Sequence, residues 1–267
     1  MAFVNYKPSL SLSEMEFVGF KYFVELFADP RFVNAFQNTI IMSFLGILLC
    51  GFVMPIMFAL IINEVGNMMF KRVAQTISYL PHFVSWVVVS GIVLQVLSPE
   101  TGIVNEILIK LNIIQAPIHF IAIDKYFYGI ATISELWKEL GWSAIIFISA
   151  IAGIDQEMYE AAEVDGAGRF RKMWSITLPS IKPTIMVILI ISVGGLISTG
   201  FEKQFLLSNP LTIDKAEVID LYALNYGINM VRFSFGTAVG IFKSLVSVTL
   251  MLVANAASKK YTEQSLW

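Results

Sequence analysis

Residues that soluble proteins rely on are scarce in this sequence. Only 14% of its 267 residues are charged, whereas a typical soluble domain has about a quarter. Its single cysteine, Cys50, cannot form an internal disulfide. Its two histidines, His82 and His119, lie far apart with no cysteine near either, so we predict no metal site. These absences argue against a soluble domain and exclude a disulfide scaffold within the chain.

Motifs for nucleotide and nucleic-acid chemistry are also missing. A net charge of −2 offers no basic surface for nucleic acid, so we expect no nucleic-acid partner. The phosphate-binding pattern G-x-x-x-x-G-K-[ST] does not occur, and no nucleophile stands in a recognisable arrangement with a base. We therefore predict that the chain is not an enzyme and holds no cofactor of its own.

Long apolar runs are the dominant feature. The hydrophobic residues, 57% of the chain, gather into five runs, each near the roughly 20 residues that a helix needs to cross a bilayer. Helices are expected, because an isolated strand would leave backbone groups unpaired in lipid. The sequence predicts an all-α integral membrane protein with five transmembrane helices, at residues 39–62, 76–97, 127–151, 184–200 and 236–257.

The distribution of lysine and arginine predicts the orientation of these spans. Loops 63–75 and 155–183 and the tail 259–267 hold cations close to span ends, which places them in the cytoplasm. The predicted organisation is an extracytoplasmic segment 1–38, a transmembrane domain 39–258 and a cytoplasmic tail 259–267, in a multi-pass protein of the cytoplasmic membrane. Because no span or signal peptide precedes the polar segment 1–38, we expect a further span upstream of it.

A polar stretch rich in alanine and glycine, YEAAEVDGAGRFRKMWSITLPS at 159–180, interrupts the apolar runs. Asp155 can cap a first short helix over 156–165, which Gly166 and Gly168 would end. A second helix over 169–177 would stop before Pro179. The alanines leave a low surface into which another protein could fit closely. An ordinary solvated turn explains the spacing equally well.

The spacing within this stretch resembles the EAA loop of binding-protein-dependent ABC importers. Glu160-Ala161-Ala162 is followed by three residues and Gly166, then by nine residues, Ile176, one residue and Leu178-Pro179. In that family, this loop docks in a groove of a cytoplasmic ATPase subunit. The resemblance implies an ATPase-coupling role, within loop 155–183, for Tyr159, Glu160, Ala161, Ala162, Asp165, Gly166, Ala167, Gly168, Leu178 and Pro179.

Three further segments, NYKPSLSL, GFKYFVELFADPRFVNAFQNT and SYLPHFVSW, resemble the carbohydrate branch of the same family, the polysaccharide and multiple-sugar permeases. The resemblance covers nearly the whole chain and implies the type I ABC importer permease fold, with the usual first of six helices missing. It also implies the partners: ABC ATPase subunits that bind ATP and Mg, a second permease subunit in a heterodimer, an extracytoplasmic solute-binding protein, a carbohydrate substrate and the lipid bilayer.

Charged and aromatic residues inside the spans are candidates for the substrate pathway, because a charge in lipid costs several kcal/mol. Glu135 and Lys138 are three residues apart and can pair, and Trp137 and Trp142 could stack on a sugar ring. If the span instead begins near Gly141, the same residues form a belt at the level of the headgroups.

Two further polar residues in the spans leave their roles open. Lys243 can face the pathway, pair across subunits or extend to the outer surface. His82, beside a kink expected at Pro81, could bond a substrate hydroxyl or pack between helices. The full set of pathway candidates is His82, Trp86, Glu135, Trp137, Lys138, Glu139, Trp142 and Lys243.

The favoured function is the transmembrane subunit of an ATP-driven importer that forms part of the pathway for an oligosaccharide. An importer permease for a non-sugar solute, such as a peptide or amino acid, would carry a similar loop. An ion-coupled secondary transporter is a different class, but such proteins often show internal repeats, and none is evident here. That class also leaves the EAA loop unexplained.

Overall fold

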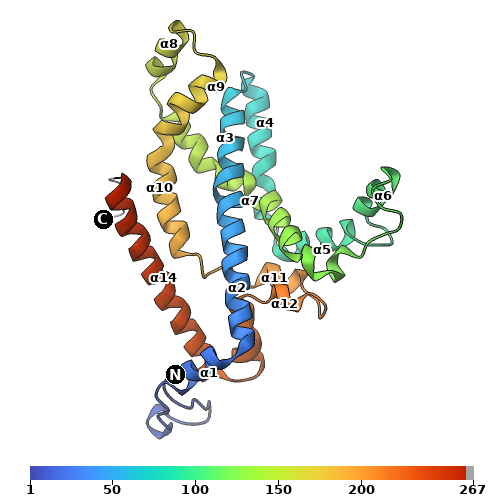
Figure 1. Cartoon of the computed structure of the whole chain (residues 1–267), viewed down its shortest axis with the longest axis vertical. Helices are drawn as coiled ribbons and strands as arrows, with labels where there is room; N and C mark the ends of the chain where they lie inside the picture. The colour runs from blue at the N-terminus through green and yellow to red at the C-terminus, as the bar shows by residue number, and fades with distance from the viewer. Residues whose placement is uncertain (263–267) are drawn as a thin grey trace. The chain divides into compact units, whose positions relative to one another are not determined.

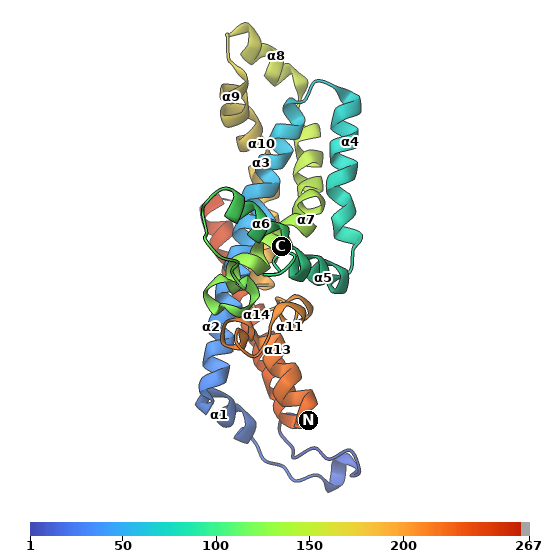
Figure 2. The same ribbon diagram turned by 90° about the vertical axis from the view of Figure 1, so that its right-hand side faces the viewer.

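The computed structural model describes residues 1–262 and is built from helices, which confirms the predicted all-α class. Within the described residues, the only β-type pairing is an isolated bridge between Val4 and Phe17. The helices shown in Figures 1 and 2 are α1 (Lys21–Ala28), α2 (Pro30–Leu45), α3 (Met54–Glu64), α4 (Met68–Tyr79), α5 (Trp86–Val96), α6 (Ile103–Lys110), α7 (Phe127–Ala152), α8 (Gln156–Val164), α9 (Arg169–Lys172), α10 (Leu178–Gly194), α11 (Glu202–Leu207), α12 (Ile213–Ala216), α13 (Ile219–Tyr222) and α14 (Phe233–Thr262).

The chain divides into two compact units. The first contains Met1–Phe44, Trp86–Ala131 and Gly194–Leu250, and the second contains Leu45–Ser85, Thr132–Val193 and the chain from Met251. The segments that alternate with the cytoplasmic ones, and are therefore predicted to be extracytoplasmic, are 1–38, 98–126 and 201–235, and all three fall in the first unit. Every predicted cytoplasmic segment falls in the second. Residues 263–267 of the predicted tail lie outside the described residues.

The first predicted span lies inside one continuous helical segment, Pro30–Glu64, composed of α2, a π-helix at Gly46–Val53 and α3. This segment starts before residue 39 because Asp29 and Pro30 form a helix start: the Asp29 carboxylate accepts the Arg31 N–H at 2.9 Å, and proline fits the first helical turn.

The second predicted span, a single helix at 76–97, is wrong. The helix α4 begins at Met68, where the Asn67 side chain caps it, and the chain then passes through a short 3-10 helix, Leu80–Phe83, before α5. Val84 is extended, which breaks the helix between α4 and α5. Leu80, before Pro81, is still helical, and Pro81 lies in the first turn of the 3-10 helix, so the break falls three residues after the proline.

The helix expected at the third predicted span is present, although it passes as a membrane span only as part of a bent pair with α8. The helix α7 runs from Phe127 to Ala152, and the charged sequence SELWKELGW does not interrupt it. The fifth predicted span, 236–257, lies within α14, which extends beyond it at both ends. Among residues 1–262, three helical segments are long and apolar enough to cross a membrane, or five if the two bent pairs each count as one span. The second number matches the five predicted spans, but the fourth, 184–200, is displaced because α10 ends at Gly194.

The predicted short helix 169–177, ended by Pro179, is also wrong. The segment Arg169–Gly194 is one helix, made of α9, a π-helix at Met173–Thr177 and α10, and it continues through Pro179 and Pro183. The π-helix supplies the reason: Leu178 donates its N–H to the Met173 carbonyl, five residues back. The wider turn leaves room for the proline ring that follows, which would otherwise clash with the preceding turn.

The helical segment Pro30–Glu64 accommodates a proline in the same way. Its π-helix, Gly46–Val53, ends just before Pro55, and the Met54 N–H donates to the Leu49 carbonyl five residues back. Sequence reasoning that treats proline as a stop therefore ended one helix too early, because a π-turn can absorb the ring.

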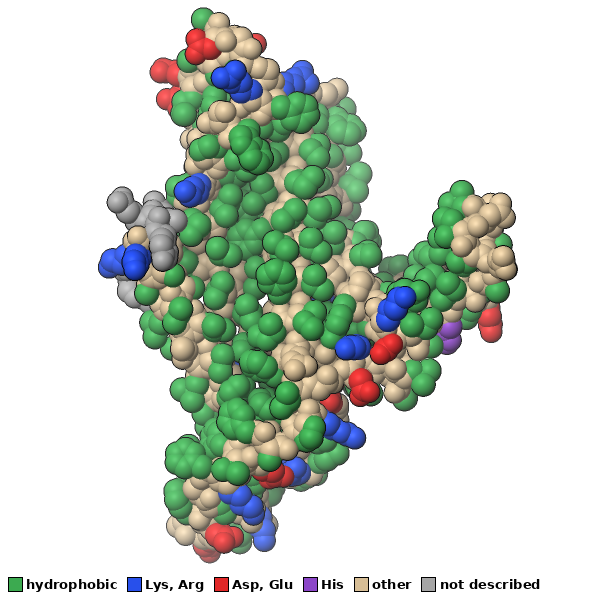
Figure 3. All heavy atoms as spheres, viewed as in Figure 1, with side chains coloured by type: hydrophobic (Ala, Val, Ile, Leu, Met, Phe, Trp, Pro, Cys, Tyr) green, Lys and Arg blue, Asp and Glu red, His purple; other side chains and the backbone are tan. Residues whose placement is uncertain are grey.

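Each unit has its own apolar core. In the first unit, the fully buried Tyr222 packs with Phe32, Phe235 and Leu26. A cluster in the second unit packs Phe147 and Ile151 of α7 against Ile181 of α10. Figure 3 shows hydrophobic side chains covering the exposed sides of the long helices, as expected of surfaces that face lipid or other subunits.

Candidate functional site

The EAA loop forms the short helix α8 as predicted. The Asp155 carboxylate accepts the Glu157 N–H at 3.0 Å and caps the first turn. The helix ends in a Schellman motif, in which the Ala167 N–H bonds the Ala162 carbonyl at 2.8 Å and the Gly166 N–H bonds the Glu163 carbonyl at 3.0 Å. Gly166 takes the left-handed conformation (φ 76°) that this motif requires, as the sequence predicts for the turn.

The outer face of α8 is open. Glu160 and Ala161 are exposed, Ala162 is half-buried, and Met158 and Val164 expose large apolar side chains. Asp165, Gly166 and Gly168 are exposed in the turn that follows. Of the remaining predicted coupling residues, Ala167 and Leu178 are half-buried, and Pro179 is exposed on α10.

Tyr159 joins α8 to the spanning helix that follows it. Its hydroxyl lies 2.9 Å from the Thr177 hydroxyl, which is buried in the π-helix, and its ring packs against the apolar cluster of the second unit. Leu178 packs against the same cluster. The hydroxyl and the ring of Tyr159 thus join α8 to the start of α10 by one polar and one apolar contact. Because of these two contacts, a displacement of α8 would be passed to α10.

Ion pairs hold the loop in place. Arg169 lies 3.9 Å from Glu64, at the end of α3, and Lys172 lies 3.3 Å from Glu163 of α8. The first pair brings loop 155–183 next to the connection between α3 and α4, as Figure 1 shows for α8, α9 and this connection. Two loops that the charge pattern assigns to the cytoplasm therefore lie at the same end of the second unit.

Four pathway candidates form a polar cluster between α7 and the 3-10 helix Leu80–Phe83 that follows α4. The Nδ1 atom of His82 lies 2.6 Å from Oε2 of Glu139, and the Lys138 ammonium donates to Oε1 of Glu139 at 3.1 Å and to the His82 carbonyl at 2.5 Å. The Trp142 ring stacks on the His82 imidazole with 4.2 Å between centroids and 1° between planes. We call His82, Lys138, Glu139 and Trp142 the polar cluster.

Burial differs within the polar cluster. The Lys138 side chain is only 8% exposed, whereas Glu139 and His82 are about a quarter exposed and Trp142 is nearly half exposed. Lys138 therefore lies inside, and its charge is compensated by Glu139. The cluster presents the carboxylate, the imidazole and one indole face to the surface of the second unit.

The other pathway candidates lie elsewhere. The Glu135 carboxylate lies beside Gly46, where an added Cβ would be 3.5 Å from it, and Trp137 is half exposed. Trp86 lies in the first unit, with the Lys203 ammonium 5.8 Å from its ring. Pairing of Glu135 with Lys138 stays a prediction.

Lys243 has a partner in its own chain. Its ammonium donates to Oδ1 of Asp220, and Oδ2 of the same carboxylate accepts the Gly200 N–H at 2.9 Å. Asp220 thus ties α13, α14 and the turn before α11 together in the first unit. This ion pair favours a structural role for Lys243 over extension to the outer surface.

A polar pocket in the first unit escaped the sequence analysis. It has a volume of about 630 Å³, and its walls include Arg31 and Asn34 of α2, Glu217, and Asn225 and Tyr226 of the π-helix Ala223–Asn229. The Asn225 amide donates to Glu217 at 3.1 Å. Burial raises the pKa of the Glu217 carboxyl above its usual value. The only signal in the sequence was the asparagine-rich stretch LNYGIN.

Comparisons with known proteins decide the family. Residues 51–263, which include α8 and the polar cluster, match the model of the family described as "Binding-protein-dependent transport system inner membrane component". The chain belongs to this family. It is therefore a multi-pass membrane component of such a transport system.

Relatives in Bacillus subtilis (strain 168) match the chain along its whole length. The protein LplB is 41% identical over all of this chain and 83% of its own length, and the polygalacturonan/rhamnogalacturonan transport system permease protein YteP is 39% identical over all of this chain and 82% of its own.

Solved structures give the same answer. A chain in the crystal structure of a bacterial ABC transporter that imports the acidic polysaccharide alginate is 41% identical, covers 92% of this chain and 85% of its own length, and superposes with a TM-score of 0.87. A second structure, of the alginate transporter in complex with an alginate pentasaccharide-bound periplasmic protein, has a TM-score of 0.88 over 93% of this chain and 85% of its own. The predicted type I ABC importer permease fold is confirmed.

Proposed function

We propose that this chain is the transmembrane subunit of an ATP-driven importer of oligosaccharides in the cytoplasmic membrane. The single observation that carries the proposal is the EAA loop, folded as an exposed small-residue helix and bonded to a spanning helix in a chain of the binding-protein-dependent family. The oligosaccharide substrate is supported by relatives about 40% identical over nearly the whole chain, whose names refer to polygalacturonan, rhamnogalacturonan or alginate.

The coupling mechanism follows from the contacts of α8. The exposed Ala161 and the half-buried Ala162 let a groove of the ATPase approach the helix backbone closely, and Glu160 can pair with a cation there. The ATPase subunits bind ATP and Mg, and their closure pushes on α8. The Tyr159–Thr177 contact then passes the movement to α10, so that the spanning helices change their tilt.

Two further partners complete the importer. A second permease subunit, in a heterodimer, supplies the other wall of the pathway, because the described residues of this chain offer three to five spans. A solute-binding protein delivers the oligosaccharide to the extracytoplasmic loops, of which 201–235 is the longest. One of the similar structures includes a periplasmic protein of this kind with its sugar bound.

The polar cluster is the part of the pathway that this chain supplies. Glu139 and His82 offer a hydrogen-bond acceptor and an imidazole at the surface of the second unit, and the exposed face of Trp142 suits the apolar face of a sugar ring. Lys138 and Glu139 neutralise each other. The mostly buried Lys138 charge is therefore not left without a counter-charge inside a membrane protein.

The coupling role is tested with Glu160→Ala in the complete importer. We expect less ATPase subunit to co-purify and uptake to fall in proportion, with normal amounts of the permease in the membrane. Glu106→Ala is the control, because it removes an exposed carboxylate from α6, in the first unit. Equal retention of the ATPase in both variants, or uptake that continues without ATP on an ion gradient, would refute the proposal.

The substrate is tested separately. Proteoliposomes with the complete importer are offered oligogalacturonides, alginate oligosaccharides, neutral arabinooligosaccharides and dipeptides, with binding protein present in each case. We expect ATP-dependent uptake of at least one oligosaccharide and none of the dipeptides. Trp142→Ala should lower that uptake while leaving ATPase co-purification unchanged, because Trp142 lies on α7 and away from α8 in the sequence.

A further inference from the structure

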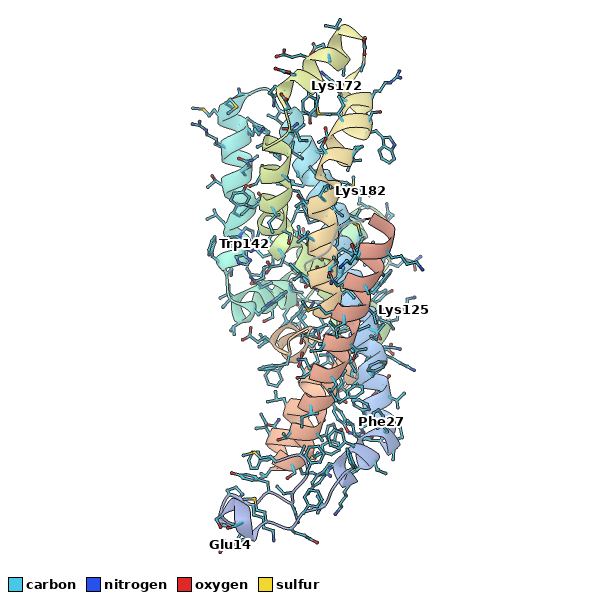
Figure 4. All side chains as sticks on the ribbon, turned by 90° about the vertical axis from the view of Figure 1, so that its left-hand side faces the viewer. Glu14, Phe27, Lys125, Trp142, Lys172 and Lys182 are labelled. Atoms are coloured by element: carbon cyan, nitrogen blue, oxygen red, sulfur yellow. The ribbon has the colours of Figure 1, made fainter. Side chains whose placement is uncertain are left out.

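The polar pocket of the first unit lies in segments that the charge pattern predicts to be extracytoplasmic. Its walls come from the first turns of α2, which precede the first predicted span at residue 39, and from residues 213–230. In Figure 4, Phe27 marks the end of α1, and α2 begins three residues further on. The volume of about 630 Å³ is typical of small-molecule sites, which span roughly 300–1,000 Å³. A solute that arrives from outside would reach this pocket before the membrane.

Hydrogen bonds from α2 fix the backbone of the opposite wall of the polar pocket. The Asn34 and Asn38 side chains donate to the Asp214 carbonyl at 2.6 and 2.8 Å. Asn38, which is buried, also donates to the Glu217 carbonyl at 2.9 Å. The walls of the polar pocket are therefore held in place within the chain, and a ligand does not have to order them on binding.

Glu217 lines the polar pocket with a carboxylate that is only partly satisfied. The residue is 7% exposed. Its Oε1 atom accepts the Asn225 amide at 3.1 Å, whereas Oε2 accepts no hydrogen bond from the residues that the structure describes. Burial raises the pKa of this carboxyl because it disfavours the charged form. A hydroxyl that donates to Oε2 would offset part of the cost of burying the charge.

The charges around the polar pocket favour an uncharged ligand. Among the described residues that line it, Arg31 is the only cation, and Asp214 and Glu217 are both carboxylates, so an anionic ligand meets net repulsion. In the described part of the chain, no three acidic, histidine or cysteine side chains are placed to hold a metal ion. The amides of Asn225 and Asn229 each carry donors and an acceptor. Sugar hydroxyls, which also donate and accept, match this set.

We propose that the polar pocket binds an uncharged sugar ring of the oligosaccharide before it enters the membrane, and that it disfavours a uronate ring. Glu217 and Asn229 bond the ring hydroxyls, and Ile213 and Met230 contact the apolar face of the ring. This site rests on the proposed importer function and adds to it a preference for neutral over acidic sugar units.

Protection of an introduced thiol measures binding at this place alone. Met230 is an exposed residue of the pocket wall, and the single native cysteine, Cys50, is buried in the second unit. The complete importer with Met230→Cys is placed in nanodiscs without solute-binding protein and alkylated in the presence of arabinotriose, trigalacturonate or dialanine. We expect arabinotriose to slow alkylation at roughly tenfold lower concentration than trigalacturonate, and dialanine to have no effect.

Variants combined with Met230→Cys test the chemistry of the polar pocket. Asn229→Ala removes one amide and should raise the half-protecting concentration of arabinotriose about three- to tenfold. Asp214→Asn with Glu217→Gln removes both negative charges and should bring trigalacturonate within about threefold of arabinotriose. The proposal is overturned by absence of protection by arabinotriose, by equal protection by trigalacturonate or dialanine, or by an unchanged preference in the double variant.

Matched controls make the same changes away from the polar pocket. Gln115→Ala removes an exposed amide, and Glu106→Gln with Asp124→Asn removes two exposed negative charges, all in the first unit. Each should leave protection of the Met230→Cys thiol unchanged. The thiol of Ile113→Cys, also exposed in the first unit, should be alkylated at the same rate with and without sugar. Protection at residue 113 as well would show a general effect of the sugar and contradict a defined site.

Failure of this inference can be told apart from failure of the proposed function. Uptake of an oligosaccharide by the complete importer, without protection of the Met230→Cys thiol, would overturn the pocket and leave the importer standing. Absence of uptake of every oligosaccharide would overturn the importer, whatever the thiol shows.

Discussion

Gly141 is the position at which the smallest change should disturb the polar cluster most. It lies on α7 between Glu139 and Trp142, where the helix contacts the C-terminal end of α4. A Cβ added to Gly141 would lie 2.2 Å from the backbone oxygen of Ser78 and 2.7 Å from its hydroxyl. A normal contact needs at least about 3.2 Å, so Gly141→Ala must push the two helices apart by about 1 Å.

The magnitude follows from overpacking. Forcing a methyl group into such a contact costs about 1–3 kcal/mol, which outweighs the roughly 1 kcal/mol that alanine gains over glycine in a helix. A 1 Å shift also stretches the 2.6 Å contact between His82 and Glu139 beyond hydrogen-bonding distance. We therefore expect Gly141→Ala to lower the unfolding midpoint of the purified protein by several degrees and to reduce uptake.

Gly129→Ala is the matched control for this experiment. Gly129 lies on the same helix, and an added Cβ would meet nothing within 4 Å, so this change should leave the midpoint unchanged or raise it slightly. Both variants are heated at the same scan rate, because unfolding of membrane proteins is often irreversible. If Gly141→Ala is as stable and as active as Gly129→Ala, then α4 and α7 do not approach each other as described.

Three other perturbations have definite expected outcomes. Gly166→Val should loosen the end of α8 and lower ATPase co-purification, because a β-branched residue at φ 76° is strained. Gly166→Asn should be tolerated much better. An equal loss of ATPase in both variants would contradict the left-handed conformation of residue 166. Asp220→Asn should lower thermal stability by roughly 1–3 kcal/mol, because it leaves the Lys243 charge uncompensated, and adding Lys243→Met should recover part of the loss. Because burial raises the pKa of Glu217, the stability of the wild type should fall as the pH rises from the usual carboxyl pKa towards the raised one. Glu217→Gln should remove this pH dependence, which thermal unfolding between pH 4 and 8 measures. The same dependence of stability on pH in wild type and variant would contradict the reasoning.

The sequence predicts long apolar helices and the EAA loop well, because both depend on local patterns. Hydropathy alone located α7 to within a residue at each end, and Asp155 and Gly166 are signals that act within one turn of the helix they delimit. The family resemblance, which rested on the EAA loop and on three further segments, agrees with a match over residues 51–263.

Sequence reasoning failed where proline meets a helix. Pro81 was expected to kink a single span, which instead breaks three residues later between α4 and α5, whereas Pro179 was expected to end a helix and does not. Pro183 likewise lies inside α10, so a proline alone does not decide whether a helix ends. A π-turn precedes Pro179 and Pro55 and makes room for the ring, and no residue type in those segments announces a π-turn in advance.

The contacts between members of the polar cluster could not be predicted from the sequence either. Spacing predicts a pair between Lys138 and Glu135, which stays a prediction, and the structure adds contacts of Lys138 with Glu139 and the His82 carbonyl. His82 and Glu139 are 57 residues apart, and nothing local relates them. Sequence could name all four members as polar residues in spans, but only the packing of α4 on α7 brings them together.

If the polar cluster lines the pathway as proposed, its composition would let one surface be stable in a membrane and also bind a sugar. A lone carboxylate beside lipid would be costly, but Glu139 has a lysine on one oxygen and an imidazole on the other. Those partners satisfy the charge without closing the site, because Lys138 lies inside while Glu139, His82 and Trp142 keep part of their surface exposed. A passing hydroxyl can therefore exchange hydrogen bonds with a group that is already compensated. Such exchange gives weak binding at each position, which is what transport requires, since a sugar held tightly within the pathway would not leave it.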